Sequence, residues 1–137
     1  MRLTRHTDYA LRILLQAAAQ PDARLAIADV AEAQGIARNH AMKVVNELAR
    51  AGLLATVRGR GGGFTLGRPA DAITIGEVVR LTEPDIRPAD CGGCALAGSC
   101  GLTGILAGAA RAFLAELDRH TLADAARTTS FPFPLLQ

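Results

Sequence analysis

Gly35 separates two short segments, residues 25–35 and residues 38–51, in which apolar residues recur every three or four positions. Each segment is long enough for a few turns of amphipathic helix. Gly35 can end the first helix at little steric cost, and Ala31 is small enough to let the two helices cross closely. This pattern predicts a helix-turn-helix, whose second helix is free to enter a groove of DNA. On this spacing alone, a helical hairpin within a bundle remains the alternative.

The residues that follow favour the DNA-binding interpretation. Residues 54–58 (LATVR) and residues 64–66 predict two short strands joined by a glycine-rich turn. A glycine-tipped hairpin directly after a recognition helix is a wing, and Arg58 and Arg60 beside its tip can enter a narrow minor groove or contact phosphates. A phosphate-binding nucleotide loop would need a strand before it and the start of a helix after it, and that context is missing here.

Further helical segments predict a mostly α fold. Residues 4–19 have one apolar stripe, with Thr4 as the expected N-cap. Residues 73–82 predict a short helix that packs on the helix-turn-helix, and Thr121, with Asp124 three residues later, is expected to begin a last short helix. Aromatic residues make up 4% of the chain and Trp is absent, so aliphatic side chains must form the core. The apolar, proline-containing tail after this helix has no predicted structure.

A longer apolar stripe follows the 3.6-residue helical period over about five turns. Its members are Leu102, Ile105, Leu106, Ala109, Phe113 and Leu117. A stripe of this length in so small a domain needs a partner, either the first helix or the same helix of a second subunit. We favour a two-fold homodimer, because helix-turn-helix proteins usually read two half-sites of a palindromic operator in double-stranded DNA. The predicted organisation is a winged helix-turn-helix domain (1–82), a cysteine loop (83–101), and a long C-terminal dimerisation helix with its tail (102–137).

The distribution of charge agrees with a DNA-binding N-terminal part. Residues 1–80 carry 11 Lys and Arg against 7 Asp and Glu, whereas residues 81–137 carry 4 against 6. The excess is modest, and a scattered, solvated surface would give the same count.

No apolar span reaches about 18 residues, so we expect no membrane segment and a cytoplasmic protein. The absence of a catalytic or nucleotide-binding constellation from the sequence argues against an enzyme.

All three cysteines of the chain, Cys91, Cys94 and Cys100, lie in one glycine-rich stretch. An odd number of thiols cannot pair completely in disulfides, and in a reducing compartment clustered cysteines more often bind metal. Thiolates and turned backbone N–H groups suit an iron–sulfur cluster. Zinc, with a fourth ligand from His or a carboxylate, suits the spacing C-x2-C-x5-C as well. The spacing leaves both metals open.

Four stretches of the chain together resemble a known family. They are the opening MRLTRHTDYALR, the segment that runs from RNHAMKVVNELARAGLL to VVRLTEP, the cysteine loop, and FLAELDRHTLADAA. These stretches match in order and at the same spacing, from Met1 to about Ala126. The chain is therefore similar to the NsrR family of nitric-oxide-sensing repressors, which belongs with the cluster regulator IscR among winged-helix bacterial transcription factors.

The resemblance implies a homodimeric repressor with an iron–sulfur cluster, 4Fe-4S in preference to 2Fe-2S, held in each subunit by Cys91, Cys94 and Cys100. The fourth ligand in this family is not a cysteine, and the matching position is Asp8 of the partner subunit. Nitric oxide is the implied signal. IscR-like members carry a histidine just past the third cysteine, but residues 102–104 are LTG, which argues against that subtype.

The side chains expected to contact DNA lie on the recognition helix and the wing. Arg38, Asn39 and His40 open the helix, where Asn can pair with adenine and Arg with guanine. Lys43 and Arg50 are expected at phosphates, and the two wing arginines complete the set.

Two alternatives remain open besides a nitric oxide sensor. The same DNA-binding dimer could respond to iron supply, cluster status or redox state, or it could be a zinc-binding regulator. The remaining histidines, His6 and His120, are expected to be plain surface or helix-end residues.

Overall fold

The computed structural model describes residues 2–135, so Met1 and residues 136 and 137 of the predicted tail lie outside the described residues. The elements in chain order are α1 (Arg5–Ala19), α2 (Ile27–Gln34), α3 (Arg38–Arg50), β1 (Leu54–Val57), β2 (Gly63–Leu66), the 3-10 helix η1 (Ala70–Ala72), α4 (Ile75–Thr82), α5 (Leu102–Asp118) and α6 (Leu122–Thr128). The predicted fold class, mostly α with a two-stranded wing, is confirmed. Among the described residues, no helix is long and apolar enough to cross a membrane.

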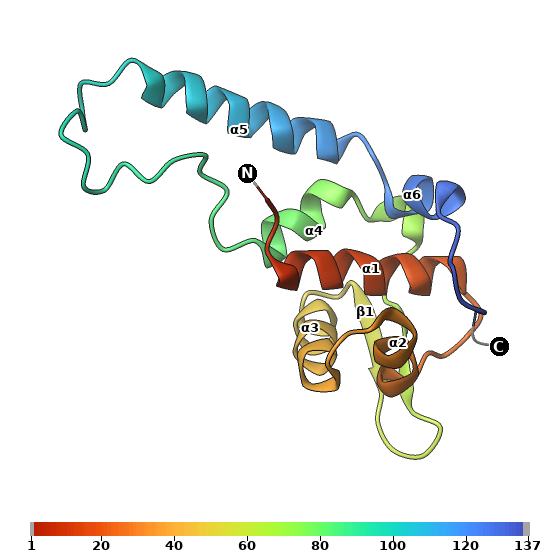
Figure 1. Ribbon diagram of the computed structural model, residues 1–137. Coiled ribbons are helices and arrows are strands. Elements are labelled where there is room, and N and C mark those ends of the chain that lie inside the picture. The colour runs from red at the N-terminus through yellow and green to blue at the C-terminus, as the bar shows by residue number, and fades with distance from the viewer. Residues whose placement is uncertain (1, 136–137) are drawn as a thin grey trace.

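α1 is the central helix, and other elements pack against it from two sides. Figure 1 shows α2, α3 and the hairpin on one side of α1, and α4 and α6 on the other. This position explains why α1 buries a broad face instead of a narrow stripe. The buried residues of α1 are Thr7, Ala10, Ile13, Leu14, Gln16 and Ala17.

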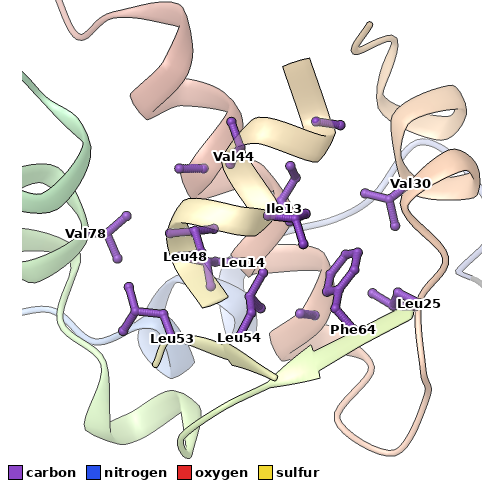
Figure 2. Packing of buried hydrophobic residues seen from close by; sticks show 14 of the residues in the cluster. Ile13, Leu14, Leu25, Val30, Val44, Leu48, Leu53, Leu54, Phe64 and Val78 are labelled. Atoms are coloured by element: carbon purple, nitrogen blue, oxygen red, sulfur yellow. The ribbon is translucent and has the colours of Figure 1, made fainter. Parts of the chain in front are cut away.

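The core is aliphatic apart from one aromatic ring. Ile13 and Leu14 of α1 meet Val44 and Leu48 of α3 there, and Phe64 of β2 lies beside them (Figure 2). None of these five side chains is more than 1% exposed. Burial of one such side chain is worth about 1.5–3 kcal/mol, so this cluster holds the recognition helix firmly against α1.

Local signals set the helix ends as the sequence predicts. The Thr4 hydroxyl accepts a hydrogen bond from the Thr7 N–H at the start of α1. Gly35 ends α2 in the left-handed conformation, with φ of 65°. Thr121 and Asp124 cap α6 reciprocally, each side chain accepting from the backbone N–H of the other.

The wing is attached to the rest of the domain along its second strand. β1 and β2 are antiparallel, with Leu54 paired to Leu66. Leu25, in the connection between α1 and α2, exchanges two backbone hydrogen bonds of 2.8 and 2.9 Å with Phe64. A Cβ atom at Gly63 would lie 2.3 Å from the Leu25 carbonyl oxygen, so this close approach requires glycine. The base of the hairpin is therefore held in place by the connection between α1 and α2.

α5 extends away from the other helices, and residues 83–101 form the irregular loop that leads to it (Figure 1). The inner end of α5 is fastened to α4, because the Arg80 guanidinium donates two hydrogen bonds to Asp118 at 2.5 and 2.7 Å. No residue of α5 is buried, and Leu102 and Ile105 of the predicted stripe are 60% and 67% exposed. Leu102 and Ile105, at the outer end of the stripe, thus have little cover from residues 2–135.

Candidate DNA interface and cysteine site

The recognition helix α3 divides into a buried face and an exposed face. Its aliphatic residues pack on α1, and the opposite face is polar and basic. Such a face supplies the positive charge that attracts a phosphate backbone. Four of the residues predicted to contact DNA are exposed on α3: Arg38, Asn39, Lys43 and Arg50.

His40, the fifth predicted residue of α3, is half-buried and contacts side chains of α1. Its ring meets Tyr9 edge-on with centroids 4.7 Å apart, and it stacks on His6 with centroids 5.5 Å apart. His6 Nδ1 lies 3.4 Å from His40 Nε2, and His6 Nε2 contacts the Glu47 carboxylate. His6 lies in the first helical turn as expected, but it is no plain surface residue: its ring joins α1 to α3.

The surroundings of His40 disfavour its protonation. Desolvation lowers the pKa of His40 below its ordinary value of 6.5, and electrostatic interactions with His6, Lys43 and Arg5 lower it further. Arg5, in the first turn of α1, therefore lies near enough to α3 to add to the same basic surface. The sequence patterns did not single out Arg5, because its place beside the recognition helix depends on tertiary packing.

The wing presents both of its predicted arginines, Arg58 and Arg60, as exposed side chains. Gly59 and Gly61 adopt positive φ angles of 94° and 69° at the tip, which accounts for the glycine-rich sequence. The Arg24 guanidinium donates a 3.2 Å hydrogen bond to the Gly61 carbonyl oxygen. Arg24 thus supports the tip from the connection between α1 and α2.

The three cysteines are free thiols, with Cys91 and Cys94 exposed and Cys100 half-buried. Cys94 donates its N–H to the Cys91 carbonyl at 3.3 Å, and the Leu96 N–H donates to Cys94 Sγ at 3.4 Å. Backbone N–H groups that turn toward sulfur are typical of cysteine sites for clusters. In the described part of the chain, however, no three His, Cys, Asp or Glu side chains converge to hold a metal ion. The donor set suits a cluster or zinc, but its thiols are not gathered in this arrangement.

Asp8, the predicted fourth ligand, is exposed in the first turn of α1 and is paired with Arg12 at 3.2 Å. Arg12 also donates a 2.5 Å hydrogen bond to the Gln34 carbonyl oxygen at the end of α2, and its guanidinium lies 5.5 Å from the centroid of the Tyr9 ring. Asp8 therefore contacts a side chain that supports the helix-turn-helix. The structure does not bring Asp8 together with the cysteines of its own subunit.

Glu83, the first residue of the cysteine loop, is tied to the start of α1. Its Oε2 accepts hydrogen bonds from the Thr7 hydroxyl at 2.6 Å, the Thr4 N–H at 3.0 Å and the Thr4 hydroxyl at 3.2 Å. Burial disfavours the charged carboxylate, but these hydrogen bonds hold the pKa of Glu83 below its ordinary value. The base of the loop and the first turn of α1 therefore form one joint.

A recognition helix with an exposed basic face and an attached, arginine-bearing wing define a winged-helix DNA-binding transcriptional regulator. Comparison with protein families places the chain within this class. The model of the Rrf2 family, described as iron-dependent transcriptional regulators, matches residues 3–128, and the chain belongs to the Rrf2 family. Members of this family are DNA-binding regulators and not enzymes, and they are typically dimeric.

Solved structures share the fold over almost the whole chain. CymR of B. subtilis, the global cysteine regulator, is 25% identical with a TM-score of 0.80, and the match covers 95% of this chain and 99% of that one. The oxidized form of Staphylococcus aureus CymR is 23% identical with a TM-score of 0.77, over 95% and 99% of the two chains. IscR of T. potens is 22% identical with a TM-score of 0.76, over 93% of this chain and 87% of that one.

Proposed function

We propose that this chain is a homodimeric repressor whose affinity for a palindromic operator is controlled by an iron–sulfur cluster that reacts with nitric oxide. The observation that carries the proposal is the placement of every thiol of the chain in one exposed loop. Packing does not account for these cysteines, because none of them is buried. The family description, iron-dependent transcriptional regulator, agrees with a metal at this loop.

Cys91, Cys94 and Cys100 would hold the cluster as thiolates, with a 4Fe-4S cluster preferred to 2Fe-2S. Asp8 of the partner subunit is the proposed fourth ligand. To bind iron, Asp8 would have to give up its ion pair with Arg12. An exposed pair of this kind is worth only about 0–1 kcal/mol, so the exchange costs little. When bound, the cluster supplies an iron whose carboxylate ligand is held more weakly than a thiolate, and which is therefore open to a diatomic ligand.

The chain's own residues would connect this loop to DNA. Asp8 of the partner subunit would fasten one subunit's α1 to the other subunit's loop, and the uncovered stripe on α5 would pair the two subunits. Half-sites one helical turn apart lie about 34 Å from each other, so release of the Asp8 tether would change how well two recognition helices dock together. A coupling of about 1–3 kcal/mol, typical of allostery, changes affinity roughly 5- to 150-fold.

A second candidate is the same repressor responding to iron supply, cluster status or redox state. The exposed free thiols favour it, because exposed thiols are open to oxidation and to metal exchange. The similarity to two CymR structures points in the same direction. CymR of B. subtilis is the global cysteine regulator, and CymR of Staphylococcus aureus has been solved in an oxidized form.

The deciding experiment is anaerobic purification, followed by visible absorbance, analysis of iron, sulfide and zinc, and operator binding before and after nitric oxide. We expect a coloured protein that releases the operator when nitric oxide is added. Stoichiometric zinc in a colourless protein would contradict the cluster. A coloured protein that keeps its DNA after nitric oxide, but loses it when iron is removed, would favour the second candidate.

The role of Asp8 has its own test. Asp8→Ala should leave the unfolding free energy nearly unchanged, because the side chain is exposed, and should shorten the lifetime of the cluster in air. Asp22→Ala, at an exposed acid in the turn after α1, is the matched control. Equal cluster lifetimes in the two variants would remove Asp8 from the ligand set.

A further inference from the structure

His6 contacts the recognition helix at two points. Its Nε2 meets the Glu47 carboxylate, and its Nδ1 lies 3.4 Å from His40 Nε2. Glu47 and His40 are seven residues apart, which is about 10 Å along a helix at 1.5 Å per residue and places both on the same face. A single ring from α1 therefore holds α3 at both ends of a two-turn span.

The hydrogen bonding of this cluster is consistent with one tautomer. A carboxylate can only accept, so the hydrogen between His6 and Glu47 belongs to His6 Nε2. In a neutral His6 the other nitrogen, Nδ1, is then an acceptor, and His40 Nε2 donates to it. The edge-on contact of Tyr9 with the His40 ring closes the cluster from α1. Each polar atom of the His6 ring thus has a partner on α3.

The turn of α1 that carries His6 is itself fixed. Glu83 accepts from Thr4 and Thr7, which lie on either side of His6 in the chain, and Thr82 donates to Thr7 at 3.0 Å. His6 therefore extends from a turn that is fastened to α4. Hydrophobic contacts between α1 and α3 limit their separation, whereas two directional contacts, made by one ring to residues about 10 Å apart along the axis of α3, also limit the rotation and the sliding of α3.

We propose that His6 is a positioning residue for sequence-specific DNA recognition, acting through Glu47 and His40 to set the rotation of the recognition helix. His40 is then part of this joint and not a residue that reads bases. The exposed side chains of Arg38 and Asn39 depend on this joint for their direction. Successive side chains of a helix point about 100° apart around its axis, so the rotation of α3 decides which of them reach a base edge, and a small rotation moves a side chain away from its base. The inference rests on the DNA-binding function of the family and is independent of the metal at the cysteine loop.

The test compares specific with non-specific binding. The probes are a duplex selected from a random library by the anaerobically purified full-length protein and a scrambled duplex of the same composition. His6→Ala should weaken binding to the selected duplex on the order of tenfold, the size of one lost base contact, and should change binding to the scrambled duplex less than twofold. His120→Ala is the control, since His120 is also paired with a glutamate but lies on the exposed connection after α5.

Further variants separate positioning from a general loss of structure. His6→Gln retains a donor for Glu47 and should recover part of the specificity. Glu47→Ala should reduce specificity as His6→Ala does, and the double variant should lose little more than either single one, because both changes break the same joint. An equal loss on both duplexes, additive effects in the double variant, or a library selection that yields no preferred sequence would overturn the proposal.

Discussion

Two regions of this molecule, a body and an arm, differ in how they are stabilised. The body comprises residues 2–82 and 121–128, and the arm comprises residues 83–120. Every buried hydrophobic side chain among residues 2–135 belongs to the body, and no residue of the arm is buried. The arm nevertheless contains a 17-residue helix. The body therefore contains the packed core, whereas the arm presents apolar and thiol surface that no other part of residues 2–135 buries.

The difference also separates the two parts of the function. The body carries the basic helix and the wing, whose geometry depends on a packed core, while the arm carries the cysteines and the apolar stripe. Regions with little buried surface open and rearrange at low free-energy cost. A regulatory loop is well placed in such a region, because its arrangement can change without disturbing the fold of the DNA-binding domain.

The largest contrast is expected between matched aliphatic truncations in the two regions. Leu14→Ala removes a side chain with no exposed surface from the body and should lower the free energy of unfolding by about 2–5 kcal/mol. Ile105→Ala removes one that is 67% exposed and should change it by less than about 0.5 kcal/mol. Urea unfolding at protein concentrations low enough to separate the subunits measures both. Similar losses would mean that the arm is packed into the body more closely than its exposure indicates.

The second prediction concerns the uncovered stripe on α5. Ile105→Glu should weaken self-association at least tenfold, because burial of an aliphatic side chain is worth about 1.5–3 kcal/mol and a two-fold interface contains the position twice. Arg111→Glu serves as the control, because it places a glutamate on the opposite face of α5: Arg111 is nine residues, about two and a half helical turns, after Leu102. Sedimentation velocity gives the association state, and circular dichroism checks that the helix content is unchanged. A dimer that tolerates Ile105→Glu would place the subunit interface elsewhere.

The third prediction concerns the joint between the body and the arm. Glu83→Gln keeps the shape of the side chain but loses the charge that three donors from Thr4 and Thr7 stabilise, and should cost about 1–2 kcal/mol of unfolding free energy, the range of a lost helix cap. Glu116→Gln, at an exposed glutamate of the arm, should have no measurable effect. If the two variants unfold alike, the Glu83 joint contributes nothing to the stability of α1.

What the sequence predicts well is local. Thr4, Gly35 and Thr121 mark helix ends through groups only a few residues away, so their roles can be read from a short window. The amphipathic stripe on α5 is local in the same sense, but the sequence left open whether it docks on the first helix or pairs with a second subunit, and in the structure no residue of α5 is buried. These features account for the agreement between the predicted and the observed elements.

The joints that organise the site could not be predicted in this way. His6 meets Glu47 across 41 residues, and Glu83 meets Thr7 across 76. Such pairs follow from how α1 packs against α3 and α4, and no period or spacing in the sequence encodes them. The cysteines stand out in the sequence by their spacing, but no three potential ligands converge among the described residues, and the metal-binding roles of the cysteines and of Asp8 stay predictions.

The smallest effect is a dependence of stability on pH that belongs to the body alone. Because the pKa of His40 is lowered in the folded protein, the unfolded chain binds more protons as the pH falls through the ordinary value of 6.5, and stability must fall with it. The groups that face His40 are His6, Tyr9, Lys43 and Arg5, with Glu47 reached through His6.

His40→Gln should therefore lose less stability than the wild type between pH 7.5 and pH 5.5, with His120→Gln as the control for a histidine of the arm. Added salt should reduce the difference only in part, because it screens the charges of Lys43 and Arg5 but leaves the desolvation of His40 in place. If the wild type and His40→Gln lose equal stability on acidification, the ring is more open to water than its contacts with α1 indicate. The contact of His6 with α3 would then depend on Glu47 alone.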